Sequence, residues 1–402
     1  TIKEGDLIAA THARGFYVMD DLSALRQLTP AIVAKGAHLY KPRDAYRIDW
    51  GGGFGGGGGG GGSPQGANPP SGATVYYQLD RANQVVTLDF LDAGGALIRS
   101  FTSNPDSLTL ADSLRGEERK TARRDSLTRA GLSADSVEKL LAAPPAEGAG
   151  GGGGGGGGDG PAGGPRPPRV PNKAGLNMFS WNLRYPDAVR FENLIMWAAN
   201  TTGPIAPPGT YQVRLRVSGQ TQTQSFVVKK DPRSTSTLAD LQEQFRFLIK
   251  VRDTVSAANN AVRTVRNVRF QVDDRSAKIA GKPQEAEFKR LALQMMDTLS
   301  AEEREVYQVK NQSNQDPLNY PIRLNNRIAA LAGVASGEYR PTKQTYAVFD
   351  SLTKDLRVRL TAVKGSLDEN LPKINALLKA AGLEPIVPGT AELKKEKPVV
   401  AS

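Results

Sequence analysis

The sequence predicts a multidomain β + α protein, in which an antiparallel β-sandwich precedes an antiparallel helical bundle. Apolar and polar side chains alternate with a period of two up to about residue 233, which is typical of half-buried strands. From Thr237 onward apolar residues recur at steps of three and four, which is typical of amphipathic helices. The change of period near residue 235 therefore marks a boundary between two kinds of module.

The first 50 residues predict a β-hairpin and an extended connector. Strands are expected over 6–11 and 15–20, with a turn between them, and residues 37–50 are expected to be extended. A hairpin without neighbouring strand patterns suits the end of a larger repeat structure. Between hairpin and connector a short helical turn is expected from three leucines spaced by three residues, Leu22, Leu25 and Leu28.

Six further strands predict an immunoglobulin-like or fibronectin-like sandwich over 73–233. The clearest is 209–217, where Tyr211, Val213 and Leu215 alternate with polar residues. The expected strands are 74–79, 85–91, 96–101, 176–183, 209–217 and 223–228.

A polar, glycine-rich insertion interrupts this sandwich at 103–172. Ser133 is expected to cap a helix that carries Val137 and Leu140, and the proline-rich return is expected to be extended. The glycine runs, in a linker at 51–72 and at 150–158, are expected to be flexible because glycine loses the most entropy on ordering.

The helical bundle is expected over 234–385, with 386–402 as a disordered tail. The first helix starts at Thr237 and runs for about 30 residues, and the last runs from Thr342 to Gly382. Ser300 to Glu303 matches a capping box and predicts the start of a short third helix. The remaining helices are marked by two apolar sets: Phe288, Leu291, Met295 and Leu299, and then Ile328 and Leu331.

Composition excludes several classes of function. With no cysteine, the chain has no disulfide, thiolate metal site or cysteine nucleophile. The sequence contains no run of 18 apolar residues, so no transmembrane segment is predicted. The net charge of +11 is dispersed along amphipathic segments, so nucleic-acid binding is not predicted.

No catalytic, cofactor or metal site is predicted. His12 and His38 lie far from any G-x-S-x-G nucleophile motif, so they do not predict a triad. Asp273–Asp274 and Asp316 lack the spacing of a calcium loop. Arg14, Arg43, Asp44 and Tyr46 have the residue types of a neuraminidase-type site, but they lie too close together in sequence to surround a sugar ring. The segment more simply predicts an Arg–Asp pair within the connector.

Aromatic residues after the strand at 176–183 are the candidates for partner binding. Trp181 is expected in the sandwich core, whereas Tyr185, Phe191 and Trp197 lie in a long proline-containing loop. Such a loop suits a platform for a protein or a sugar. We therefore expect Tyr185, Phe191 and Trp197 to contact a partner.

Several stretches resemble the C-terminal region of exported bacterial proteins with sortilin-like, neuraminidase-repeat (BNR) β-propellers. They are "GDLIAATHARGFYVMDDLSALRQL", "AHLYKPRDAYRIDW", "AGLNMFSWNLRYPDA", "GPIAPPGTYQVRLRV" and "VVKKDPR". The resemblance implies that the opening hairpin is a β-propeller remnant from the last blade, and that the sandwich and bundle are accessory modules. The Asp-box pattern S-x-D-x-G-x-T-W is absent, so the propeller itself would lie upstream.

The predicted function is a non-catalytic interaction or assembly module at the bacterial cell envelope, in the periplasm, on the cell surface or secreted. Its expected partners are a protein, the upstream propeller domain, or a polysaccharide. Two alternatives stay open: the ancillary half of a glycoside hydrolase or lyase with an upstream active site, and a subunit of a filament or large complex. The sequence leaves the oligomeric state and the ligand open.

Overall fold

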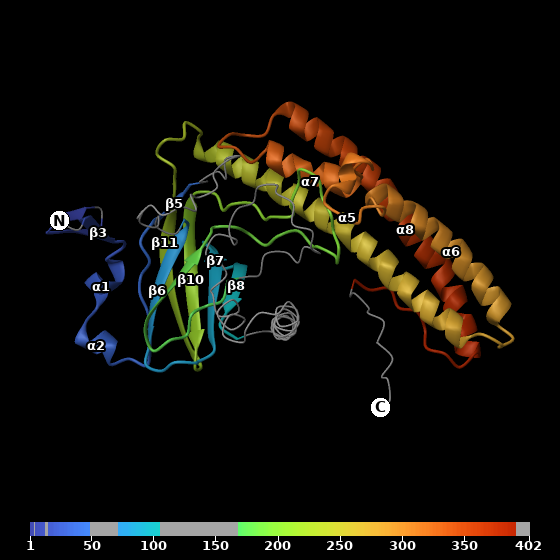
Figure 1. The fold of residues 1–402 in the computed structure, drawn as a ribbon, viewed down its shortest axis with the longest axis horizontal. Helices are drawn as coiled ribbons and strands as arrows, with labels where there is room; N and C mark the ends of the chain where they lie inside the picture. Colours follow the sequence, from blue (N-terminus) through green and yellow to red (C-terminus); the bar gives the residue numbers. More distant parts are fainter. Residues whose placement is uncertain (4, 13–14, 49–70, 105–167, 391–402) are drawn as a thin grey trace, which may run out of the picture. The chain divides into compact units, whose positions relative to one another are not determined.

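The computed structural model describes residues 1–3, 5–12, 15–48, 71–104 and 168–390 (Figure 1). Within these, the chain forms two compact units. The first holds the strands and contains the described residues up to 183 together with 208–231, and the second holds the long helices and contains 184–207 and 232–390. The expected helix at Ser133 and the glycine runs lie outside the described residues.

The N-terminal hairpin is confirmed and gains a third strand. β1 (Ile2–Lys3) pairs with β2 (Asp6–Thr11), which pairs antiparallel with β3 (Gly15–Met19). The register places four large apolar side chains on one face of this sheet, and each is between 38% and 63% exposed: Ile2, Leu7, Tyr17 and Met19.

Within the connector, which was predicted to be extended, two segments form β-strands, one in each of two further sheets. After the short helices α1 (Ser23–Gln27) and α2 (Pro30–Val33), β4 (Ala37–Leu39) pairs with β6 (Ala73–Leu79). β5 (Ala45–Arg47) pairs in parallel with β11 (Gln220–Lys230), so this sheet is not purely antiparallel.

The expected arginine–aspartate pairing in the connector also has different partners. Arg43 pairs with Asp6 at 3.2 Å and with Asp21 at 3.7 Å, whereas Asp44 pairs with Lys229 at 2.7 Å. The connector is therefore tied to the N-terminal sheet and to β11, because oppositely charged groups from both lie within reach of it.

All six strands expected for the sandwich are confirmed; 209–217 is found with the expected ends, and the ends of the others differ by at most three residues. The other four are β7 (Val86–Asp92), β8 (Leu97–Thr102), β9 (Gly175–Trp181) and β10 (Gly209–Val217). They form a five-stranded sheet of order β5-β11-β10-β7-β8 and a three-stranded sheet of order β4-β6-β9.

The two sheets curl as a half-barrel around one core. Trp181 of β9 is fully buried, as expected, and stacks on Phe90 of β7 with ring centroids 4.8 Å apart. Inward residues of β10, such as Val213 and Leu215, are also fully buried. Together with the helical unit, these mixed sheets place the chain in the α+β class.

The helices follow the expected period of 3.6. α5 (Leu238–Lys278) is capped by Thr237, whose hydroxyl accepts from the Asp240 backbone while Asp240 bonds back to Thr237. α6 (Glu285–Val306), α7 (Leu324–Val334) and α8 (Lys343–Ala380) follow, with a 3-10 turn at Asp316–Leu318 before α7.

The separate helix predicted to begin at Ser300 is wrong, because α6 continues through this position without a break. The Glu303 carboxylate does not cap a helix. It accepts hydrogen bonds from Arg266 at 2.8 Å and from Arg269 at 2.7 Å, both on α5, and Ser300 also accepts from Arg269.

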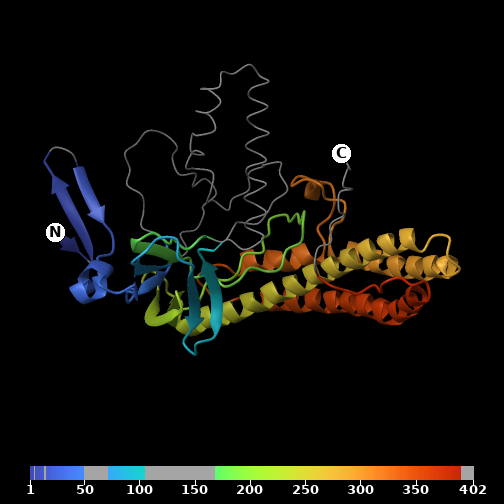
Figure 2. The same ribbon diagram turned by 90° about the horizontal axis from the view of Figure 1, so that it is seen from below.

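α5 and α8 run parallel, and α6 followed by α7 runs antiparallel to both (Figures 1 and 2). Near their starts, Phe247 of α5 meets Phe349 of α8 with ring centroids 5.4 Å apart. Near their ends, Ile279, Ile374 and Phe288 belong to a second buried cluster. The helical unit is therefore a long bundle with two apolar cores along its length.

Candidate functional site

The strongest candidate site lies where the chain turns back along α5 and α8. Gly382 has a φ of +72° and donates to the Lys379 carbonyl at 3.0 Å, while Leu383 donates to the Leu378 carbonyl at 2.8 Å. These are the two bonds of a Schellman motif, which ends α8 and reverses the chain. We call residues 383–390 the strap; its last five residues lie in the expected disordered tail, and 391–402 fall outside the described part.

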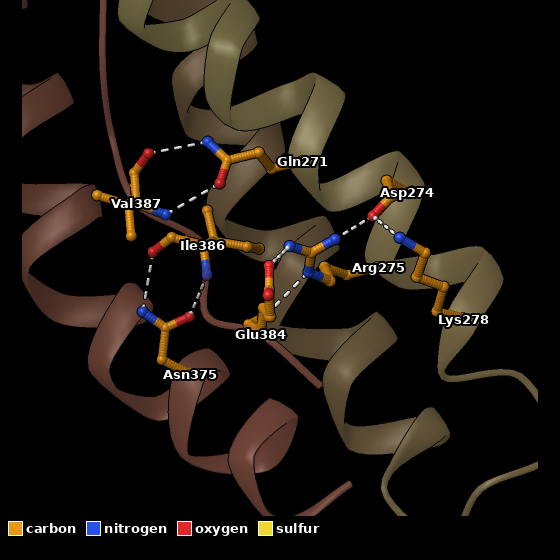
Figure 3. Close-up of polar contacts among 8 residues, drawn as sticks. All are labelled: Gln271, Asp274, Arg275, Lys278, Asn375, Glu384, Ile386 and Val387. Atoms are coloured by element: carbon orange, nitrogen blue, oxygen red, sulfur yellow. Dashed lines mark hydrogen bonds and ion pairs between the residues drawn. The ribbon is translucent and has the colours of Figure 1, made fainter. Parts of the chain in front are cut away.

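Two side-chain amides hold successive residues of the strap (Figure 3). Asn375 of α8 accepts from the Ile386 N–H at 2.7 Å and donates to the Ile386 carbonyl at 3.0 Å. Gln271 of α5 accepts from the Val387 N–H at 3.0 Å and donates to the Val387 carbonyl at 2.8 Å. Because the backbone groups of successive extended residues point to opposite sides, the strap is bound from both helices, as a central strand is in a sheet.

A charged cluster secures the start of the strap. Arg275 donates from Nε to the Glu384 carbonyl at 2.9 Å and also contacts Asp274 (Figure 3). Asp274 accepts from Lys278 at 2.9 Å, and this hydrogen bond holds the pKa of the Asp274 carboxyl below its ordinary value. Asp274 is therefore an ion-pair partner of two cations rather than a free acid or base.

A cavity of about 550 Å³ lies beside the end of the strap. The strap contributes Ile386 and Pro388 to its lining. The walls are mainly aliphatic and come from both helices: Ala261 and Thr264 of α5, and Leu360, Val363, Leu367 and Leu371 of α8.

Four of the twelve residues that line this cavity are polar: Thr264, Lys364, Asp368 and Asn375. Lys364 and Asp368, one helical turn apart on α8, form an exposed ion pair within the lining. The volume of the cavity and its mainly aliphatic walls lie within the range of ligand-binding sites. A ligand in this cavity would be recognised mainly by its shape and by apolar contacts with the aliphatic walls.

The three predicted partner-contacting residues lie on the 184–207 loop of the helical unit. Phe191 is only 5% exposed and packs edge-to-face on Tyr307, with Arg266 over its ring at 4.7 Å. Tyr185 meets Phe245 at 4.7 Å. Since Phe245 and Arg266 are about 30 Å apart along α5, the structure does not bring Tyr185 and Phe191 together.

Trp197 is the most exposed of these three residues, at 39%. Its backbone is held by Asn326, which accepts from the Trp197 N–H at 2.7 Å and donates to its carbonyl at 2.9 Å. This is the same two-bond amide bracket as in the strap. Partner binding by Tyr185, Phe191 and Trp197 stays a prediction.

The other residues weighed from the sequence have structural contacts of their own. His38 lies on β4 with its ring centroid 4.8 Å from that of Tyr40. The pKa of His38 is lowered mainly by burial and, to a smaller extent, by the positive charge of Lys35. The Asp316 carboxylate accepts backbone N–H groups of residues 312 and 313, which lowers its pKa. Across the residues placed by the structure, no group of three acidic or histidine side chains is arranged to hold a metal ion.

Sequence reasoning missed the strap and its two brackets. One signal was present: Asn259, Asn267 and Gln271 lie in or beside the apolar ridge of α5, where polar residues need partners. No helix in the described parts of the chain is long and apolar enough to cross a membrane.

No family model, curated protein or solved structure matches this chain. The resemblance to sortilin-like propeller proteins therefore stays a prediction.

Proposed function

We propose that this chain is a non-catalytic interaction module whose helical unit binds a partner protein beside the strap. The observation that carries the proposal is the aliphatic cavity between α5 and α8, which is continuous with a groove already holding an extended segment. Its aliphatic lining favours a protein over a polysaccharide, because sugar sites use stacking aromatic rings.

The finer fold assignment belongs to the same proposal. The shared core of the two sheets supports an immunoglobulin-like or fibronectin-like sandwich as an accessory domain. The exposed apolar face of the N-terminal sheet, with Leu7 and Tyr17, supports packing against an upstream β-propeller in an exported, sortilin-like bacterial protein.

The test compares the full chain with two tryptophan variants on a random-peptide library and a glycan array. Thr264→Trp fills the cavity, whereas Thr298→Trp places the same residue on the exposed side of α6. We expect a binder whose signal falls for Thr264→Trp and is unchanged for Thr298→Trp. The proposal would be contradicted if neither the peptide library nor the glycan array yields such a binder.

A further inference from the structure

We infer that residues 391–393 of this chain, which we call the strap extension, continue the strap through the cavity between α5 and α8. A partner that binds in the cavity then has to displace them. The contact within the chain goes beyond the proposed function, whereas the competition with a partner rests on it.

The strap leads directly into this cavity. Ile386 is bound by Asn375, which lies in the lining, and two residues later Pro388 contributes to the lining as well. The strap extension begins directly after Thr390, so it starts beside the remaining walls. A segment tethered this closely has an effective concentration of about millimolar at the cavity, which favours it over a free occupant.

The length of the cavity matches the strap extension. Leu360 lies about four turns before Asn375 on α8, a distance of about 22 Å at 1.5 Å per residue. An extended chain rises about 3.3 Å per residue and covers this length in about seven residues. Counted from Ile386, the seventh residue is Leu393, the first large aliphatic residue after Pro388. Leu393 therefore reaches the part of the cavity that Leu360 lines.

The side-chain pattern also fits the aliphatic walls. At the end of the strap, Gly389 is half-buried and Thr390 is exposed, which sets the phase in which an extended chain continues. In this phase Ala391 and Leu393 face the groove, and the charged residues that alternate with them face away from it. Apolar and polar residues thus alternate with the period of an extended chain that is buried on one side.

One backbone acceptor in the cavity wall lacks its helix partner. Pro372 lies inside α8 and has no N–H, so the Asp368 carbonyl, four residues earlier, receives no helix hydrogen bond from it. Both residues line the cavity. A backbone N–H of the strap extension can supply the missing donor, just as the strap exchanges backbone bonds with Asn375 and Gln271.

The contact is tested by disulfide formation in the full chain, which has no cysteine of its own. Ala261 lies on the α5 wall about 15 Å before Gln271, a length that an extended chain covers in about four to five residues beyond Val387. Residues 391 and 392 both lie at this level, and only Ala391 faces the groove.

We expect Ala261→Cys with Ala391→Cys to form an intrachain disulfide at least about tenfold faster than two control pairs. The first control, Ala261→Cys with Glu392→Cys, has almost the same tether but the opposite phase. The second, Thr298→Cys with Ala391→Cys, places one thiol on the exposed side of α6. A folding defect is excluded when the reduced variants keep the thermal unfolding midpoint of the parent chain.

The competition is tested with a peptide selected from the random library on the full chain. Leu393→Asp places a charge against aliphatic walls and weakens the strap extension, so the peptide should bind this variant at least about tenfold more tightly. Val399→Asp makes the same kind of change outside the strap extension and should leave the affinity as it is.

Three outcomes separate the two proposals. Equal disulfide rates in the three pairs, or a faster Glu392→Cys pair, would overturn the inference and leave the interaction module standing. An unchanged peptide affinity of Leu393→Asp would overturn the competition. A fast disulfide between residues 261 and 391, without any binder from the library, would support the contact and contradict the proposed function.

Discussion

Asn375 and Ile386 form a closed ring of two hydrogen bonds, with the Asn375 amide donating at 3.0 Å and accepting at 2.7 Å. This pair of hydrogen bonds, which we call a bracket, takes the place of the bonds that an extended residue would form with a neighbouring β-strand in a sheet. It also explains how a segment bordered by Pro385 and Pro388 keeps a defined place on two helices (Figure 3).

Removing this bracket should release the strap. Asn375→Ala leaves the Ile386 N–H and carbonyl without partners, and we expect a loss of about 1–3 kcal/mol in the free energy of unfolding. Urea denaturation measures the loss, and hydrogen exchange at Ile386 should become faster. Asn314→Ala, at an exposed loop position, serves as the control; an equal loss in both variants would refute the bracket's role.

Two adjacent strap residues should respond very differently to truncation. Ile386→Ala removes a buried side chain and should cost about 2–5 kcal/mol, because it leaves a cavity in the second core. Val387→Ala keeps both backbone bonds to Gln271 and removes an exposed side chain, so its effect should stay within about 0.5 kcal/mol. Similar losses in urea denaturation would show that the strap does not lie in the groove as described.

Glu303 should be the most sensitive carboxylate of the helical unit. Glu303→Gln keeps the shape but leaves Arg266 and Arg269 without their shared counter-ion; since both arginines are about one-third exposed, we expect a loss of about 1–3 kcal/mol. The matched change Glu287→Gln breaks an exposed pair with Arg290 and should have little effect. Chemical denaturation of both variants under the same conditions measures the difference, and equal losses would count against a structural role for the buried carboxylate.

The stability of the sheet unit should fall on acidification because of His38. Burial and the charge of Lys35 lower the folded-state pKa of His38 below its ordinary value of 6.5. The unfolded chain therefore binds more protons below about pH 6.5, so stability decreases as the pH falls through this window toward the folded-state pKa. Urea denaturation at about pH 7.5 and about pH 5.5 should show a smaller loss for His38→Gln than for the parent chain. A loss of the same size in both would exclude this histidine as the cause.

The main elements could be predicted from sequence because their signals are local. Alternation in 209–217 and the ridge from Leu241 to Val265 follow directly from the geometry of a strand and a helix. Even Thr237 and Thr342 were recognisable as the residues before the two long helices. Burial of Trp181 followed from its place on the inward face of its strand.

The strap and the Glu303 cluster could not be predicted because their partners are distant in sequence. Gln271 and Val387 are separated by 116 residues, so the local composition around Val387 indicates only a polar tail. Ser300 and Glu303 match a capping box locally, but two arginines from α5 bind the carboxylate instead. In both cases tertiary hydrogen bonds decide a structure that local propensity would assign differently.

The most direct test of the docking account uses the absence of cysteine from the chain, because Ala261→Cys then gives one site for an environment-sensitive fluorophore at the far end of the cavity. Titration with a peptide selected on the parent chain should produce a saturable change in emission, and the same label at Thr298→Cys should give none. A flat response at residue 261, or equal responses at both positions, would contradict the claim that a partner binds between α5 and α8.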